Sequence, residues 1–382
     1  MLFPVAAAAR QAGHRVRVAT SAALSGLVEE WGLTPIPLST VVSLDELRND
    51  PELAERYRLP QELTHPDRHT TAAAVETAIV RAFAGPLAGV FADDLISSIG
   101  KERPDLIVRE SAELGGYLAA ESLGLPHAQL DTAPMSALTA HLALPALNEQ
   151  RVRLGLPPVT DPAHPSRGLL AGFVPESWYP AELRLATAKY YRPPNAESVP
   201  LALDPTDRPT VYAGLGTLAP TLPGFERLIT TIIAALGTLP VNATVALGAD
   251  RLLADPVPDN VRLVTSLPQR EFLRTCDLFI SHAGFGAVQD SIATGVPMVA
   301  LPLFSDQPAN AARMAELGLA ITLDPDRVTA NSLADACTLL LADPQYGRRA
   351  RSLTHASSEL PGVDTLLADL ETLARRAGVV SV

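Results

Sequence analysis

The chain has few basic residues, few aromatic side chains and almost no cysteine. Its 30 Lys and Arg residues are outnumbered by 42 Asp and Glu residues, and the net charge of -12 excludes the basic surface of a nucleic-acid-binding protein. Phe, Trp and Tyr make up 5% of the residues, which argues against stacking platforms for single strands. Two isolated cysteines, Cys276 and Cys337, cannot form a disulfide scaffold or a metal cage.

Long apolar runs are also missing. No stretch approaches the roughly 20 apolar residues of a membrane helix. The N-terminus has no basic region before its apolar run, which Arg10 and Gln11 interrupt, so no signal peptide is recognised. We therefore expect a cytoplasmic protein without membrane insertion. With 382 residues, 47% of them hydrophobic, the chain is long enough to bury the cores of two domains.

Residues 277–318 carry the most informative pattern in the sequence. A short apolar run, 278–280, is typical of a buried parallel strand, and it leads into a turn that contains Gly284 and Gly286. Glycines allow backbone N–H groups to approach a ligand closely. The helix that follows is expected to end at Gly295. This order aims the N-terminal end of a helix at the carboxyl edge of a sheet, where it can bind phosphate.

A second expected strand, 296–301, places two polar side chains at the same edge. Asp306 and Gln307 follow it directly, at the start of the next helix. Ligands bind at the carboxyl ends of the strands in open α/β sheets. Phosphate donors beside a carboxylate and an amide would suit a diphosphate next to a polyol. The pattern therefore predicts a nucleotide-sugar site.

The rest of the chain repeats the α/β alternation. A buried strand, 105–108, is followed by Arg109, Glu110 and Ser111 at its carboxyl end. A proline-rich polar stretch, 190–208, is typical of a linker. Beyond it, a strand leads into a glycine turn at 215–217. We predict an α/β protein with two doubly wound, Rossmann-like domains.

The 277–318 stretch resembles the donor-binding signature of the family-one glycosyltransferases, which are GT-B enzymes. The matching residues are His282, Gly284, Gly295, Val296, Pro297, Pro302, Asp306, Gln307, Asn310, Ala311 and Glu316. The resemblance implies a GT-B fold with two domains facing a cleft. The acceptor-binding domain would span 1–192, the linker 193–208 and the donor-binding domain 209–360, and a C-terminal helix in 361–382 would pack back on the first domain.

The resemblance also implies a set of donor-binding residues. They are Gly216, Thr217, Leu267, Gln269, His282, Gly284, Phe285, Gly286, Ala287, Asp306 and Gln307. Leu267 would hold the base through its backbone, whereas Ser266 stands where many relatives have a stacking tryptophan. Ala287 replaces a frequent phosphate-binding hydroxyl, so phosphate recognition would rely on backbone N–H groups and His282. No metal and no cofactor are expected.

The resemblance is closest to bacterial enzymes that glycosylate antibiotics and other polyketide or aromatic natural products. It implies inverting, metal-independent transfer from a TDP-deoxysugar or UDP-glucose to a hydroxyl of a small lipophilic acceptor. The oligomeric state is left open, with a homodimer as one option.

The family's general-base histidine falls at Met1 in this sequence, and the strand that relatives have before it is absent, so we assign no catalytic residue. Either the start of the sequence is assigned too late, or the chain is a truncated or inactive relative. Loss of that strand would leave two unpaired rows of backbone groups in the first domain. Two alternatives stay open. One is a catalytically impaired relative that binds a nucleotide sugar or assists a partner enzyme. The other is a nucleotide-sugar epimerase that uses Glu110 and Glu113.

Overall fold

The chain folds into two compact units. The computed structural model describes residues 2–41, 50–57, 72–99, 102–194, 207–217, 219–221, 224–248 and 256–378. The first unit comprises Met1–Phe173, Ala181–Pro194 and Pro361–Val382, and the second comprises Val174–Pro180 and Asn195–Leu360. No helix in these described ranges is long and apolar enough to cross a membrane.

The second unit is built on one parallel sheet of six strands. Their order is β12-β11-β10-β7-β8-β9. The strands are β7 (Thr210–Gly214), β8 (Asn242–Ala246), β9 (Val261–Val264), β10 (Leu278–Ser281), β11 (Met298–Ala300) and β12 (Ala320–Thr322). This is the doubly wound order, in which the chain reverses direction between β7 and β10. Ligands bind at such a switch point, so the turns after β7 and β10 are the ones to inspect.

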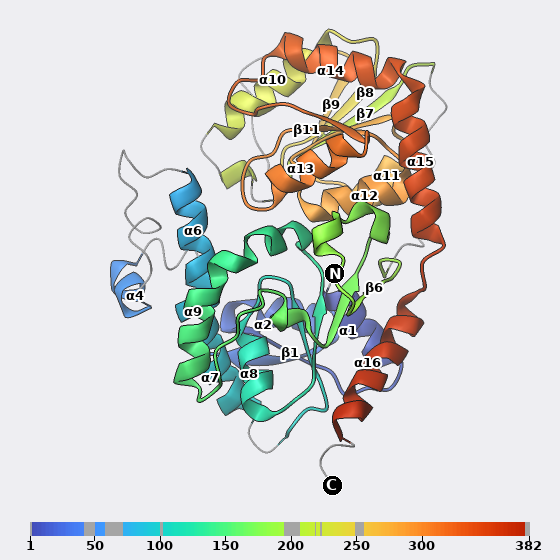
Figure 1. Ribbon diagram of the computed structural model, residues 1–382. Coiled ribbons are helices and arrows are strands. Elements are labelled where there is room, and N and C mark those ends of the chain that lie inside the picture. Colours follow the sequence, from blue (N-terminus) through green and yellow to red (C-terminus); the bar gives the residue numbers. More distant parts are fainter. Residues whose placement is uncertain are drawn as a thin grey trace. The chain divides into compact units, whose positions relative to one another are not determined.

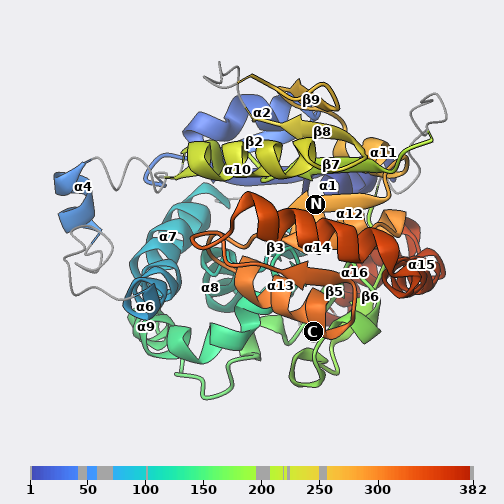
Figure 2. The same cartoon turned by 90° about the horizontal axis from the view of Figure 1, so that it is seen from above.

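Helices cover both faces of this sheet because its side chains alternate between them. Val211 and Ala213 of β7 join the apolar cluster under α10 and α14, whereas Tyr212 stacks on Phe279. Figures 1 and 2 show α10 and α14 along one face of the sheet, and α12 and α13 pack together on the other. The helices are α10 (Phe225–Gly237), α11 (Gln269–Leu273), α12 (Phe285–Thr294), α13 (Gln307–Glu316), α14 (Ala330–Ala342) and α15 (Pro344–Ser358).

The first unit contains two separate parallel sheets. One pairs β1 with β2, and the other has the order β3-β4-β5-β6. The strands are β1 (Arg17–Ser21), β2 (Thr34–Leu38), β3 (Ile107–Glu110), β4 (His127–Leu130), β5 (Leu169–Gly172) and β6 (Ala188–Tyr190). No strand in the described part of the chain pairs with the second edge of β1 or of β3. The sequence predicted two such unpaired rows.

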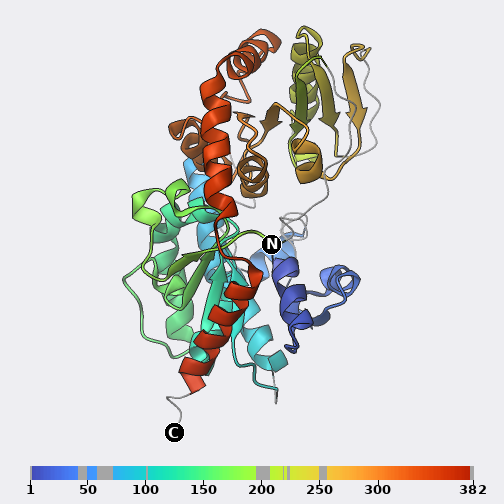
Figure 3. The same cartoon turned by 90° about the vertical axis from the view of Figure 1, so that its right-hand side faces the viewer.

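One helix of the first unit, α1, packs against both of its sheets. Phe3 of α1 joins the apolar cluster of β1, and Val5 joins the cluster of β4 and β5. Leu366 and Leu370 of α16 pack into the latter cluster, and Figure 3 shows α16 running along this unit. The helices are α1 (Leu2–Gln11), α2 (Ser25–Glu30), α4 (Pro51–Arg56), α6 (Ala72–Ala82), α7 (Ala88–Ile99), α8 (Gly115–Leu123), α9 (Ala140–Arg153) and α16 (Val363–Gly378).

The observed division differs from the predicted one in a short segment. Residues 1–192 were assigned to the first domain, whereas Val174–Pro180 lies in the second unit. The guanidinium of Arg313 on α13 explains the difference. It donates hydrogen bonds to the backbone oxygens of Ser177, Trp178 and Tyr179, at 2.9, 2.6 and 3.4 Å. No local pattern in the sequence predicts this contact, because it joins positions more than 130 residues apart.

The split of the first unit's sheets leads to a prediction about local stability. A two-stranded sheet is marginal without further pairing, and backbone hydrogen bonds of weakly supported elements open more often. We expect the amides of β1 and β2 to exchange with solvent at least about tenfold faster than those of β7 and β8. Hydrogen exchange followed by mass spectrometry measures this. Equal protection of the two strand pairs would contradict it.

Candidate functional site

A tight turn connects β10 to α12 at the switch point. Ala283 is buried and adopts a left-handed conformation with φ of 57°, which is unusual for a residue with a side chain. Two hydrogen bonds hold it there. Its N–H donates to Ser281 Oγ at 3.2 Å, and its carbonyl oxygen accepts from Asn310 Nδ2 at 3.0 Å. The turn therefore presents His282 and Gly284 in a fixed geometry.

The N-terminal end of α12 is open. Gly284 is the N-cap, and no side chain caps the helix. The Val288 N–H donates to the Gly284 carbonyl at 3.1 Å and starts the helical ladder. The N–H groups of the turn before it point along the helix axis, where the helix dipole adds positive potential. This is the arrangement that binds phosphate oxygens.

Two of the predicted donor-binding residues in this helix have buried side chains. The Phe285 ring packs against Trp178, with centroids 5.4 Å apart, and Ala287 is 4% exposed. Their side chains thus belong to the core, and what they present to a ligand is backbone. Gly286 is exposed, and a Cβ atom at this position would meet no atom within 4 Å.

His282 lies between two glycines. A Cβ atom at Gly216 would stand 2.8 Å from the imidazole, and one at Gly284 would stand 2.5 Å from its Nε2. Gly216 also has a φ of 82°, so it meets both demands that only glycine satisfies. Burial lowers the pKa of His282 to about 4, and the ring is neutral at pH 7. Its Nδ1 is buried without a partner in the described structure.

The remaining residues predicted from the glycine turn and the base loop have different surroundings. Thr217 is exposed directly after Gly216, and Leu267 is half-buried before α11. The Gln269 side chain is engaged within the protein, because its Nε2 donates to Asp290 Oδ2 at 2.8 Å. Arg270 Nε donates to the other oxygen of Asp290 at 2.7 Å. Asp290 thereby ties the start of α11 to α12.

Asp306 and Gln307 start α13, as predicted. Burial raises the pKa of Asp306, whereas a hydrogen bond from Asn310 lowers it in part. Gln307 is 3% exposed, and its Oε1 accepts from the N–H groups of Leu303 and Phe304 at 2.8 and 3.1 Å. The Gln307 oxygen therefore shapes its own loop, and the amide nitrogen is the part of this side chain that remains for a ligand.

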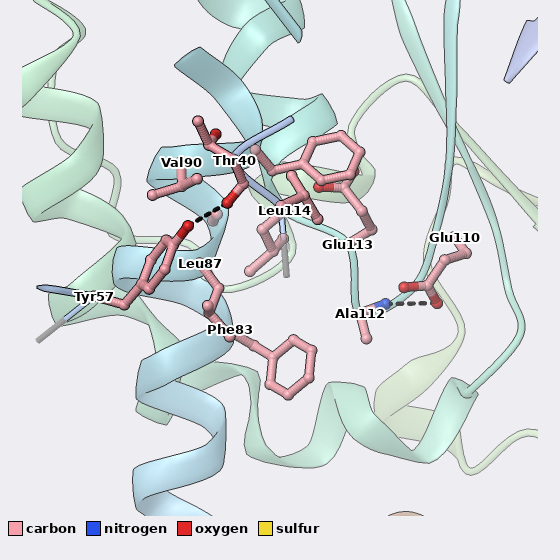
Figure 4. A pocket seen from close by; sticks show the side chains of 12 residues that line it. Thr40, Tyr57, Phe83, Leu87, Val90, Glu110, Ala112, Glu113 and Leu114 are labelled. Carbon is pink, nitrogen blue, oxygen red and sulfur yellow. Dashed lines mark hydrogen bonds between the residues drawn. The ribbon is translucent and has the colours of Figure 1, made fainter. Parts of the chain in front are cut away.

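A separate pocket lies inside the first unit, at the carboxyl ends of β2 and β3 (Figure 4). Its volume is about 200 Å³, and its walls are mostly apolar. The lining residues are Thr40, Val41, Tyr57, Phe83, Leu87, Ala88, Val90, Phe91, Glu110, Ala112, Glu113 and Leu114. The π-helical segment Phe83–Leu87, which bends at Gly85, contributes part of one wall.

Two carboxylates line this pocket. Glu110 accepts hydrogen bonds from the Ala112 N–H and from Thr132 Oγ1, at 3.0 and 2.9 Å. Glu113 accepts from the N–H of Gly116 at the start of α8. Burial raises the pKa of Glu113 to about 7, and this effect exceeds the opposing effects of Gly116 and Arg109. The pocket thus joins an apolar surface to a carboxyl group that titrates near neutral pH.

No group of three or more His, Cys, Asp or Glu side chains in the described ranges is arranged to hold a metal ion. The Asp-Pro-Asp sequence at 324–326 forms a turn, in which Asp324 Oδ1 accepts from the Asp326 N–H at 2.9 Å.

Sequence reasoning missed the role of Asp290 and left Asn310 without one. Asn310 lies four residues after Asp306, a spacing that places the two side chains on one helix face. That spacing was visible in the sequence. The contact between Asp290 and Gln269 had no such signal, because it depends on how α11 packs against α12.

The raised pKa of Glu113 predicts a dependence of stability on pH. The native pKa lies above the unfolded value, so the unfolded state releases this proton first as the pH rises. We expect the free energy of unfolding to fall between about pH 4.5 and 7, by up to about 3 kcal/mol. Glu113→Gln should remove this loss, and Glu149→Gln, at an exposed glutamate of α9, should not. Denaturant titrations at pH 5 and 8 measure the free energy of unfolding at each pH. An equal change between the two pH values in all three proteins would contradict the prediction.

A known protein family matches both halves of the chain. Residues 7–163 match the N-terminal domain and residues 230–373 the C-terminal domain of the family described as erythromycin biosynthesis protein CIII-like. Aklavinone 7-beta-L-rhodosaminyltransferase of Streptomyces galilaeus is 28% identical, over 97% of this chain and 91% of the relative. 10-Deoxymethynolide desosaminyltransferase of Streptomyces venezuelae is 28% identical, over 98% and 93%.

Solved structures give the same result for the fold. The glycosyltransferase SnogD from Streptomyces nogalater is similar with a TM-score of 0.73 and 25% identity, over 97% of this chain and 95% of that one. The glycosyltransferase SsfS6 of Streptomyces sp. SF2575, complexed with thymidine diphosphate, has a TM-score of 0.74 and 21% identity, over 97% and 95%. The predicted GT-B fold is confirmed. The chain belongs to the erythromycin-biosynthesis-CIII-like family, and thereby to the bacterial natural-product glycosyltransferases.

Proposed function

We propose that this chain transfers a sugar from a nucleoside diphosphate donor to a hydroxyl of a small lipophilic natural product. The observation that carries the proposal is the uncapped end of α12 beside a neutral, partly buried His282. It supplies backbone donors and a side-chain donor at one point of the sheet edge. A diphosphate is the ligand that matches this set.

In the proposed donor complex, the diphosphate lies against the turn after β10. Backbone N–H groups at the start of α12 and the imidazole N–H of His282 donate to its oxygens, and Thr217 adds a hydroxyl. Leu267 holds the base through its backbone. Asp306 and the amide nitrogen of Gln307 bind hydroxyls of the sugar. The Asp306 carboxylate accepts hydrogen bonds from sugar hydroxyls, and the donors at the helix end match the negatively charged phosphate oxygens. Each end of the site therefore matches the part of the ligand assigned to it.

The reaction we propose is a single displacement with inversion at the anomeric carbon. The acceptor oxygen forms the new bond, the nucleoside diphosphate leaves with the electron pair, and the acceptor proton passes to a base. Negative charge grows on the leaving diphosphate in the transition state, and preorganised donors at the helix end stabilise it. A metal ion is not required for this step, because the helix end and His282 act on the same oxygens.

The donor we favour is a TDP-deoxysugar, with UDP-glucose as the alternative. Several relatives are named for transfer of rhodosamine, desosamine or mycaminose, and two structural neighbours are described in complex with thymidine diphosphate or DTDP. For the acceptor, the apolar pocket of the first unit suits a lipophilic ring system, with Glu110 and Glu113 as the polar groups that a hydroxyl can meet.

A nucleotide-sugar-binding partner protein would use the same donor site without a catalytic base, and it is the second candidate function. Turnover separates the two functions, since a binding partner would hold the donor and release no nucleoside diphosphate when an acceptor is added. Donor conversion without an acceptor would point to an epimerase instead.

The first test is calorimetric titration with TDP and UDP. We expect binding to the wild type and about tenfold to 100-fold weaker binding to His282→Ala, which loses a hydrogen bond to a charged phosphate. Circular dichroism checks that the variant is folded. The same affinity in both proteins would remove His282 from the donor site, and absence of binding to the wild type would overturn the proposed function.

A glycine pair tests the close packing around the imidazole. Gly216→Ala forces a Cβ atom into the ring of His282 and imposes strain at a φ of 82°. Gly26→Ala, at an exposed position of α2 in the first unit, adds a methyl group where no atom lies within 4 Å. We expect the first change to weaken TDP binding by about tenfold or more and the second to change it by less than about threefold. Similar losses of TDP affinity in both variants would argue that the close packing of Gly216 against His282 is not needed for binding.

A further inference from the structure

Asn310 joins the two halves of the proposed donor site. It lies in the first turn of α13 and is fully buried. Its Nδ2 donates to Asp306 Oδ2 at 2.9 Å and to the Ala283 carbonyl oxygen at 3.0 Å. One amide group therefore touches both the turn that carries His282 and the carboxylate assigned to the sugar.

The bond to Ala283 holds a strained turn. A left-handed conformation is unfavourable for a residue with a side chain, and it persists only where the surroundings impose it. Asn310 supplies this constraint from α13, and Ser281 Oγ supplies a second one from β10. Because Ala283 lies between His282 and Gly284, its orientation sets both the imidazole and the N-cap of α12.

The bond to Asp306 orients the carboxylate and favours its charged form. It occupies Oδ2 and leaves Oδ1 to accept from a ligand hydroxyl. In the described structure, the groups that act on the pKa of Asp306 are the Asn310 amide and the backbone N–H of Asp306, both of which lower it against the effect of burial. No charged side chain among the described residues contributes to the pKa shift of Asp306.

We propose that Asn310 is a positioning residue that fixes the phosphate-binding turn and the sugar-binding carboxylate relative to each other. The inference rests on the proposed function and adds a device for holding the sugar and the diphosphate as one rigid unit. Asn310 touches neither part of the donor itself. It acts through Ala283 on the phosphates and through Asp306 on the sugar.

The test compares TDP and TDP-glucose as calorimetric probes. In Asn310→Ala, TDP affinity should fall by about tenfold, and the additional affinity of TDP-glucose over TDP should be lost. Asp306→Ala should abolish that additional affinity and lower TDP affinity less than Asn310→Ala does. In the double variant, the ratio of the two affinities should fall no further than in Asp306→Ala. Asn310→Asp keeps the shape of the side chain, loses the donors and is expected to behave like Asn310→Ala.

Arg313→Met is the matched control for a purely structural effect. It removes buried hydrogen bonds from the same helix without touching Ala283 or Asp306. We expect it to lower the melting temperature and to leave both affinities unchanged. If it reproduces the affinity losses of Asn310→Ala, or if both Asn310 variants bind both probes like the wild type, the inference is overturned.

A pH series supplies a readout that loss of stability would not move. Without the Asn310 bond, the pKa of Asp306 should rise. A protonated carboxyl group is a weaker acceptor for a hydroxyl of the sugar than a carboxylate. The additional affinity of TDP-glucose should therefore fade at a higher pH in a variant that retains part of it, such as Asn310→Ser, than in the wild type. Identical pH midpoints would overturn the link to Asp306. If the wild type binds TDP but the variants show none of these shifts, this inference alone is overturned. If the wild type does not bind TDP, the proposed function is overturned.

Discussion

A neutral imidazole packed against backbone is the contact on which the proposed donor site depends. His282 can occupy its position only because Gly216 and Gly284 leave no Cβ atoms in its way. These glycines come from the turns after β7 and β10, which are neighbours only in a sheet that reverses direction at this point. The fold therefore creates the site, because the same residues on adjacent segments of another sheet would not meet. Burial then keeps the ring uncharged and available as a hydrogen-bond donor.

The sequence contained much of this arrangement. Apolar runs, glycine turns and the position of Asp306 predicted the order of strands and helices in the second unit, because each signal is local. Side-chain roles were harder to predict. Phe285 and Gln269 matched a donor-binding pattern, yet the first packs on Trp178 and the second binds Asp290. Which face of a helix meets a neighbouring element is decided by packing between distant segments, and one sequence does not reveal it.

In the first unit, the sequence predicted strand edges but not the contacts between distant segments. The sequence predicted unpaired strand edges, and β1 and β3 have them within the described residues. It did not predict how the two sheets stay together. α1 does so by placing Phe3 and Val5 in different apolar clusters, so that one short helix serves both sheets. The pocket lined by Glu110 and Glu113 lies in this unit, so its shape depends on the contacts that hold the unit together.

The hydrogen bonds between Arg313 and the segment Val174–Pro180 matter for protein engineering. Domain exchange between related transferases is an obvious way to combine one donor with another acceptor, and the linker before β7 is the natural place to cut. A junction there would carry Val174–Pro180 away with the wrong half. Arg313 would keep its charge and lose three backbone acceptors, and Phe285 would lose the ring of Trp178. A chimera that keeps these contacts takes that seven-residue segment from the same parent as α13.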